Sequence, residues 1–147
     1  MSEKILLDSI LQCLEEIKSR DSVSSEIPSK VRARARSIPE LSFTRGLAYA
    51  MVFIASKSSK DLVELGLKEQ ECKDIIDKIY KDNISIEEKS YAVYGAVLLF
   101  VARKLGIAKG TKFEDVVRDI MKSPVLEVKM LNVLDWLKRI AEAYIIE

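Results

Sequence analysis

A run of arginine and lysine between positions 28 and 60 is the part of this sequence best suited to chemistry. The run holds seven basic residues and one acid, Glu40, whereas the whole 147-residue chain has a formal net charge of only +1. Basic groups without nearby carboxylates are typical of surfaces that bind phosphate. We therefore expect contact with a nucleic-acid backbone through these residues: Lys30, Arg32, Arg34, Arg36, Arg45 and Lys57.

The alternative for this basic segment is an ordinary solvated helix face, because Lys and Arg often cover apolar neighbours with their stems. Four basic residues fall within the seven positions from Lys30 to Arg36, with no acid among them. A purely structural helix would normally carry Glu at i±4 to relieve the repulsion. The pattern therefore favours contact with phosphate groups, which binds the nucleic-acid backbone without selecting a base sequence.

Catalytic and metal-binding chemistry has little support in this sequence. The chain contains no histidine, which excludes histidine bases, histidine metal ligands and Ser-His or Cys-His nucleophile pairs. Adjacent acids such as Glu15–Glu16 and Glu87–Glu88 point about 100° apart on a helix and cannot converge on one ion. We expect no enzyme activity, no metal or other cofactor and no small-molecule substrate.

The cysteines and the apolar runs indicate where in the cell the protein is found. Cys13 and Cys72 are far apart, lie outside any CxxC spacing and fall within helical patterns, so we expect two buried, reduced thiols. Apolar runs such as Tyr91–Ala102 are shorter than the roughly 18–20 residues of a membrane span. The N-terminus has mixed charge, unlike a signal peptide. The sequence predicts a cytoplasmic protein without membrane contact.

Apolar periodicity predicts one all-α domain over residues 1–147. We expect an N-terminal helix over 1–19, a flexible Ser-rich connection over 20–27 and a helical core over 28–147. In the core, a helix should have Pro28 in its first turn and end before Pro39, because the residue before proline disfavours helical backbone. The next should cover 42–57 and include Gly46, and Gly66 should end a short helix over 61–65.

The second half of the chain has clear helix boundaries. Residues 67–80 should form one helix, and a capping box from Ser85 to Glu88 should open another. That helix, 86–105, is apolar nearly all round and should be the centre of a compact bundle of about six to seven helices. Thr111 to Glu114 is a second capping box, and Ser123 with Pro124 should begin a helix to Tyr144. Trp136 should pack at its edge.

Three segments, taken together, resemble the small helical subunit of the type III-B (Cmr) CRISPR RNA-silencing effector. Their order and spacing along the chain carry the resemblance, which spans about two-thirds of it. The segments are Arg32-x-Arg34-Ala35-Arg36-Ser37-Ile38-Pro39-x-Leu41, then Gly46-Leu47-Ala48-x-Ala50-x-x-Phe53-Ile54-x-x-Lys57, and Trp136-Leu137-Lys138-Arg139-Ile140-Ala141-Glu142-Ala143.

The resemblance implies a non-catalytic subunit that stacks with copies of itself and with sibling subunits. It implies a minor filament beside the guide-RNA-bearing backbone, with contact to guide and target RNA in antiviral defence. It also implies phosphate contacts at Lys138 and Arg139, besides those in the basic segment. Two alternatives stay open: a protein-interaction subunit whose arginines meet an acidic sibling, and a helix-turn-helix regulator that binds DNA.

Overall fold

The computed structural model describes residues 3–20 and 25–145, which form nine α-helices and no strand. Two of these helices have only four residues, and the all-α prediction is confirmed. The bounds are α1 (Glu3–Lys18), α2 (Glu26–Arg45), α3 (Leu47–Lys57), α4 (Lys60–Val63), α5 (Leu65–Lys68), α6 (Cys72–Lys81), α7 (Ile86–Lys104), α8 (Phe113–Lys122) and α9 (Pro124–Tyr144).

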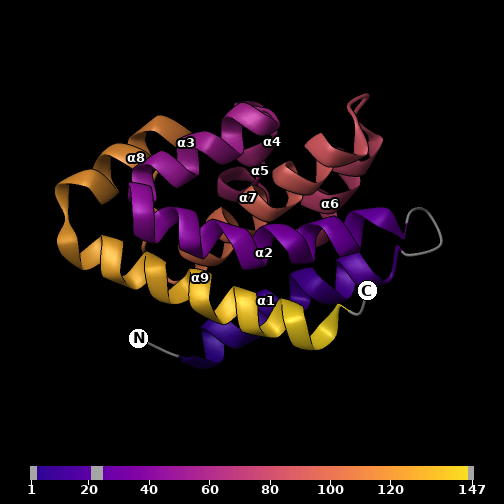
Figure 1. The fold of residues 1–147 in the computed structure, drawn as a ribbon, viewed down its shortest axis with the longest axis horizontal. Helices are drawn as coiled ribbons and strands as arrows, with labels where there is room; N and C mark the ends of the chain where they lie inside the picture. Colours follow the sequence, from indigo (N-terminus) through magenta and orange to yellow (C-terminus); the bar gives the residue numbers. More distant parts are fainter. Residues whose placement is uncertain (1–2, 21–24, 146–147) are drawn as a thin grey trace.

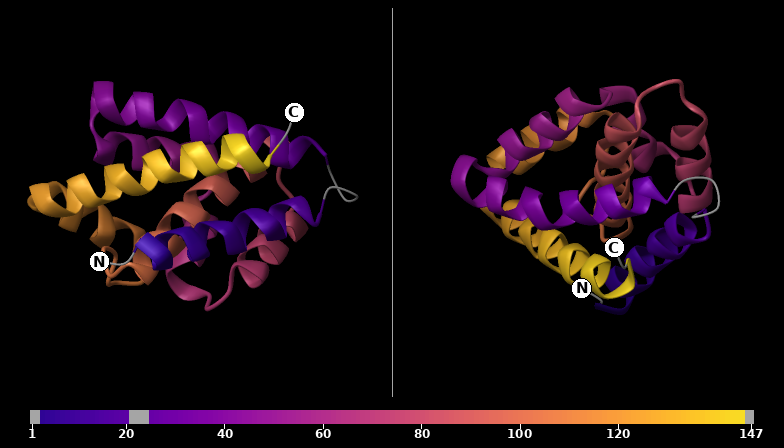
Figure 2. Two further views of the ribbon diagram at one scale, coloured as in Figure 1. Left: turned by 90° about the horizontal axis from the view of Figure 1, so that it is seen from below. Right: turned by 45° about the vertical axis from the view of Figure 1, so that its right-hand side comes forward.

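Helix α7 lies at the centre of the bundle, as its sequence predicts. Every residue from Ser90 to Ala102 is buried, and α1 to α6 and α9 all contact α7 (Figure 1). In the right-hand view of Figure 2, α9 and α1 lie at the bottom and α3 lies at the top. α1 packs against both α6 and α9. The predicted capping box is present, because the Ser85 hydroxyl accepts from the Glu88 N–H and the Glu88 carboxylate accepts from the Ser85 N–H.

Helix α2 runs through Pro39, so the prediction that it would end there is wrong. The proline lacks the N–H that would bond the carbonyl four residues earlier, and its ring crowds that carbonyl. The helix continues because its buried stripe extends past the proline, from Ala35 and Ile38 to Ser42. α2 begins at Glu26, so Pro28 lies in its first turn as predicted, and the predicted connection over 20–27 extends two residues too far. Of the predicted connection 20–27, residues 21–24 lie outside the described residues.

Two glycines have the opposite roles to those predicted. Gly46, expected inside a helix, has a φ of +97° and separates α2 from α3. A residue with a Cβ is strained in that conformation, so Gly46 sets the turn. Gly66, expected to end a helix, lies within α5, where a Cβ would overlap the carbonyl of Ala96 on α7. Gly66 is therefore required for close packing of α5 on α7.

Helix starts in the second half of the chain are partly as predicted. The predicted helix over 67–80 is α6, which begins only at Cys72. α8 begins at Phe113 without a side-chain cap, so the capping box at Thr111 is not formed. α9 begins as expected, with the Ser123 hydroxyl accepting from the Leu126 N–H at 3.2 Å. Trp136 is partly buried against the core, as predicted.

Cys13 and Cys72 form a disulfide, which corrects the prediction of two reduced thiols. The bond joins α1 to α6 with 5.2 Å between the two Cα atoms, and both residues are fully buried. The cysteines lie 59 residues apart in sequence. Their spacing therefore gave no signal, and only the packing of α1 on α6 brings them together.

The Cys13→Ala, Cys72→Ala variant should lose about 2–4 kcal/mol of unfolding free energy, because the bond closes a long loop in the unfolded chain. Urea unfolding with and without reductant measures this loss. Reductant should destabilise the wild type and leave the variant unchanged. If thiol alkylation under denaturing, non-reducing conditions labels both cysteines of the wild type, the disulfide is absent.

The carboxylate of Glu64, only 5% exposed, connects α4 and α5 to α8. Its Oε2 accepts from the Phe113 N–H at 2.8 Å, and the ammonium groups of Lys60 and Lys68 lie 3.4 and 3.2 Å from the carboxylate. Burial alone raises the pKa of this carboxyl. The Phe113 hydrogen bond and the two lysines outweigh burial, so the pKa of Glu64 is lowered overall.

The folded protein stabilises the ionised form of Glu64 more than the unfolded chain does. The Glu64 carboxylate therefore stabilises the fold at pH values above its ordinary pKa of 4.5. That stability is lost as the pH falls through the lower, folded pKa. Glu64→Gln should cost about 1–2 kcal/mol at pH 7. In denaturant titrations the difference from wild type should shrink below the ordinary Glu pKa. Asp61→Asn, at an exposed position, serves as the control, and an equal loss in both variants would contradict this account.

Candidate nucleic-acid interface

Arg34 faces inward, against the beginning of α7, and its side chain is only 17% exposed. Its guanidinium lies 4.1 Å from the centre of the Tyr91 ring and 3.6 Å from the Glu87 carboxylate. Its Nε donates to the Ser90 hydroxyl at 3.4 Å. Arg34 therefore fastens α2 to α7, and its charge is engaged inside the molecule by the Glu87 carboxylate and the Tyr91 ring.

Arg36 lies on the side of α2 that faces α9. Its Nε is 3.3 Å from the Glu142 carboxylate, and Arg139 lies 3.4 Å from the same carboxylate. The premise that these arginines have no acidic partner is thus wrong for Arg34 and Arg36. The acids come from α7 and α9, 53 and 106 positions along the chain from the arginines that they meet.

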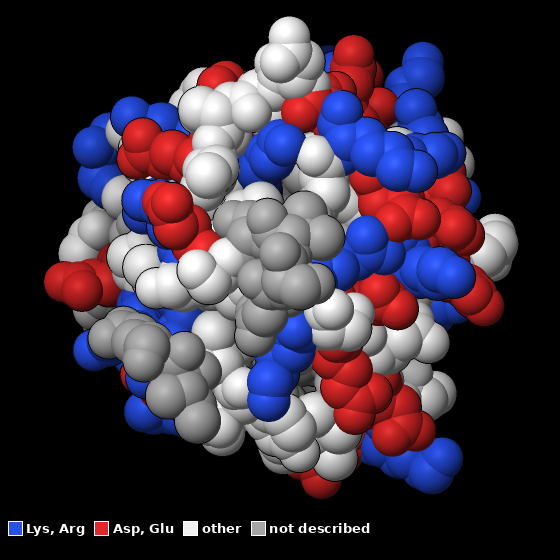
Figure 3. All heavy atoms as spheres, turned by 90° about the vertical axis from the view of Figure 1, so that its right-hand side faces the viewer, with Lys and Arg blue, Asp and Glu red and all other residues white. Residues whose placement is uncertain are grey.

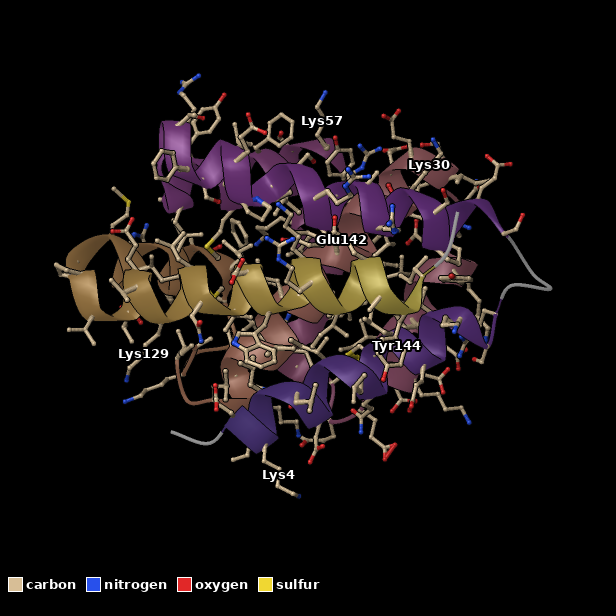
Figure 4. The ribbon with its side chains drawn as sticks, turned by 60° about the horizontal axis from the view of Figure 1, so that its bottom comes forward. Lys4, Lys30, Lys57, Lys129, Glu142 and Tyr144 are labelled. Carbon is tan, nitrogen blue, oxygen red and sulfur yellow. A yellow bond between two sulfur atoms is a disulfide. The ribbon has the colours of Figure 1, made fainter. Side chains whose placement is uncertain are left out.

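An open groove of about 470 Å³ lies between α2 and α9. It brings the predicted Arg36 together with Lys138 and Arg139, from the other end of the sequence. Glu142 lies on the side of α9 toward α2 (Figure 4). Lys138 has no acid within salt-bridge distance among the described residues. The α2–α9 groove is lined by Ala33, Arg36, Ser37, Glu40, Lys138, Arg139 and Glu142.

The remaining predicted residues lie outside this groove. Arg45, the last residue of α2, and Lys57, the last residue of α3, are both exposed. Arg45 lies over the Tyr49 ring at 4.1 Å and Lys57 over the Phe53 ring at 5.5 Å. Lys30 and Arg32 are half-buried on the first half of α2. The structure therefore divides the eight predicted residues into four sets: three in the groove, two at the C-terminal ends of α2 and α3, two on the first half of α2, and the inward-facing Arg34.

Exposed apolar side chains near these cations were missed by the sequence argument. Phe43 is 90% exposed, Val52 51% and Tyr49 42%. Only Leu47, Ala50, Met51 and Ile54 of α3 are buried, so Tyr49 and Val52 lie outside the buried face of this helix. The available signal was an apolar content too large for one buried face. A second exposed set, Met121, Val125 and Val128, lies where α8 meets α9.

Charge is mixed on other parts of the surface. On the face in Figure 3, basic and acidic side chains alternate without forming one basic field. Across the described ranges, no group of three or more Cys, Asp or Glu residues could hold a metal ion. Likewise, no helix between residues 3 and 145, outside 21–24, has the length and apolar composition that crossing a membrane requires.

Comparison with protein families places this chain. A family model described as "CRISPR-associated protein (Cas_Cmr5)" matches residues 6–144, a range that includes every residue predicted for the interface. A search of curated proteins and a search of solved structures each found no match. The match covers nearly the whole chain and agrees with the resemblance noted in the sequence. The chain belongs to the Cas_Cmr5 family of CRISPR-associated proteins and is a Cmr5-type subunit of type III-B systems.

Proposed function

We propose that this chain is a non-catalytic structural subunit of a type III-B CRISPR ribonucleoprotein effector and contacts the backbone of the guide and target RNA. The observation that carries the RNA contact is the α2–α9 groove, where Arg36 meets Lys138 and Arg139. Two segments separated by about a hundred residues supply these cations to one open surface. Family membership supplies the setting in a CRISPR effector.

A phosphate can enter this groove without breaking its ion pairs. The side chains of Arg36 and Arg139 are 53% and 68% exposed, and both share Glu142, so each guanidinium keeps N–H donors for a further oxygen. Lys138 adds an ammonium with no described acid in reach. Contacts of this kind hold the RNA backbone and leave the bases unread.

The other predicted residues take different parts in the proposal. Lys30, Arg32, Arg45 and Lys57 add further phosphate contacts along α2 and α3. Arg34 supports the surface indirectly, because it holds α2 against Glu87 and Tyr91 of α7. Copies of this chain and sibling subunits are the proposed protein partners, in the cytoplasm. The exposed Met121 and Val125 give such a partner an apolar contact.

The two alternatives differ in how they fit the structure. A subunit that binds only protein would have its arginines meet an acidic sibling, and Glu142 already shows that a carboxylate fits between Arg36 and Arg139. A helix-turn-helix regulator needs a connection of three to four residues between its helices. α2 and α3 are separated by Gly46 alone, which does not fit that motif.

Neutralising the α2–α9 groove should weaken RNA binding and its dependence on salt. Arg36→Gln, Lys138→Gln and Arg139→Gln together should lower the magnitude of the log–log salt slope by about 2, at about 0.7 per phosphate contact on a single strand. Fluorescence polarisation of a labelled RNA at several salt concentrations measures the slope. A triple Gln variant at Lys109, Lys122 and Lys129, which are exposed on other parts of the surface, is the charge-matched control.

A flat salt response of the wild type, or equal effects of both triple variants, would contradict the proposed groove contact. Tagged purification from the native cell separates the protein-only alternative. Loss of guide RNA with sibling subunits retained would support RNA contact by the groove. Loss of the sibling subunits themselves would favour the alternative.

A further inference from the structure

The α2–α3 corner combines exposed rings with unpaired positive charge. We define the α2–α3 corner as Phe43, Arg45, Tyr49, Val52 and Lys57, which are all exposed. From position 41 to position 57 the chain contains no acid. Among the described residues, no carboxylate lies within salt-bridge distance of Arg45 or Lys57. Their positive charges are thus available to a ligand, unlike that of Arg34.

The aromatic side chains of the α2–α3 corner are placed for contact from outside. Phe43, at 90% exposure, is the most exposed large apolar side chain of the described chain. The guanidinium carbon of Arg45 lies over the Tyr49 ring, 4.1 Å from its centre, so a cation and a ring adjoin at the surface. Single-strand binders combine such rings, on which bases stack, with cations that hold the backbone.

We propose that the α2–α3 corner binds an unpaired stretch of RNA, with bases stacking on Phe43 and Tyr49 and phosphates held by Arg45 and Lys57. This inference rests on the proposed function and adds the form of the RNA. Duplex RNA keeps its bases stacked on one another, so only unpaired bases can stack on these rings. The corner therefore distinguishes single-stranded from paired RNA, whereas the groove does not.

A strand of RNA can run from the α2–α9 groove to the α2–α3 corner along α2. Arg36, Glu40 and Phe43 follow one another at i, i+4 and i+7 and so lie on one stripe of α2. Seven residues of helix span about 10 Å, and the eleven residues of α3 span about 16 Å. A strand whose backbone lies in the groove can reach Phe43 along this stripe and continue over α3.

A protein partner is the rival occupant of this surface, because exposed apolar groups often mark protein interfaces. Such a partner would have to supply acids for both Arg45 and Lys57, whereas each RNA phosphate supplies a charge. The α8–α9 junction offers a contrast within the same chain. Its exposed Met121, Val125 and Val128 are aliphatic and provide no ring for stacking.

The test compares truncation of exposed apolar side chains to Ala at the α2–α3 corner and at the α8–α9 junction of the full-length protein. Phe43→Ala with Tyr49→Ala should raise the Kd for a single-stranded RNA at least about tenfold, given the strength of base–aromatic stacking. The Kd for the same RNA annealed into a duplex should stay within about twofold. Met121→Ala with Val125→Ala is the matched control and should bind both RNAs as the wild type does. Tyr49→Phe keeps the ring and should also behave as wild type.

Three outcomes would overturn the stacking proposal. One is an unchanged Kd for the single strand in the double ring variant, and another is an equal loss for single strand and duplex. The third is a ring variant that loses a sibling subunit from the native complex while RNA stays bound, because that result assigns the corner to a protein partner. If the groove triple variant weakens RNA binding while the ring variant does not, only this inference fails. A wild type that binds neither RNA at low salt overturns both proposals.

Discussion

The burial of α7 is the constraint on which the rest of this fold depends. Its residues from Ser90 to Ala102 are all buried, so the other helices must cover α7 on all sides. Helices that pack closely on α7 need small residues where they cross it. Gly66 lies against the Ala96 carbonyl for this reason, and Gly95 of α7 lies against Ile54 and Val63. The helices that carry the cations, α2 and α9, are held in place by the same burial.

The position of α2 decides which positive charges face a ligand. Arg34 points inward, because Tyr91 and Glu87 at the beginning of α7 offer a ring face and a carboxylate. Arg36, two residues later, points to α9 and stays half exposed. The number of basic residues in a sequence segment therefore does not give the number of positive charges that can contact a ligand. Residues with no described acid in reach, such as Lys57 and Lys138, weigh more in an RNA contact than that number suggests.

Sequence predicted those parts of the fold that local chemistry determines. The capping box at Ser85, the N-cap at Ser123 and the apolar composition of α7 are local signals, and all three are confirmed. The errors arise where distant packing outweighs local preference. Burial on both sides of Pro39 carries α2 through a proline. Likewise, Glu64 reaches 49 positions along the chain to bond the Phe113 N–H, which replaces the expected capping box of α8.

The interface follows the same division between local and distant determinants. Sequence alone could identify the basic residues, but it could not show that Arg36 shares Glu142 with Arg139, since that contact depends on how α2 crosses α9. Nor could it show that Phe43 is left uncovered where α2 turns at Gly46. A strand of RNA that follows α2 from the groove to this turn would meet paired cations first and rings second. Contact with the RNA backbone and stacking of unpaired bases would then follow one another along α2, because Arg36 in the groove and Phe43 at the corner lie on one stripe of this helix.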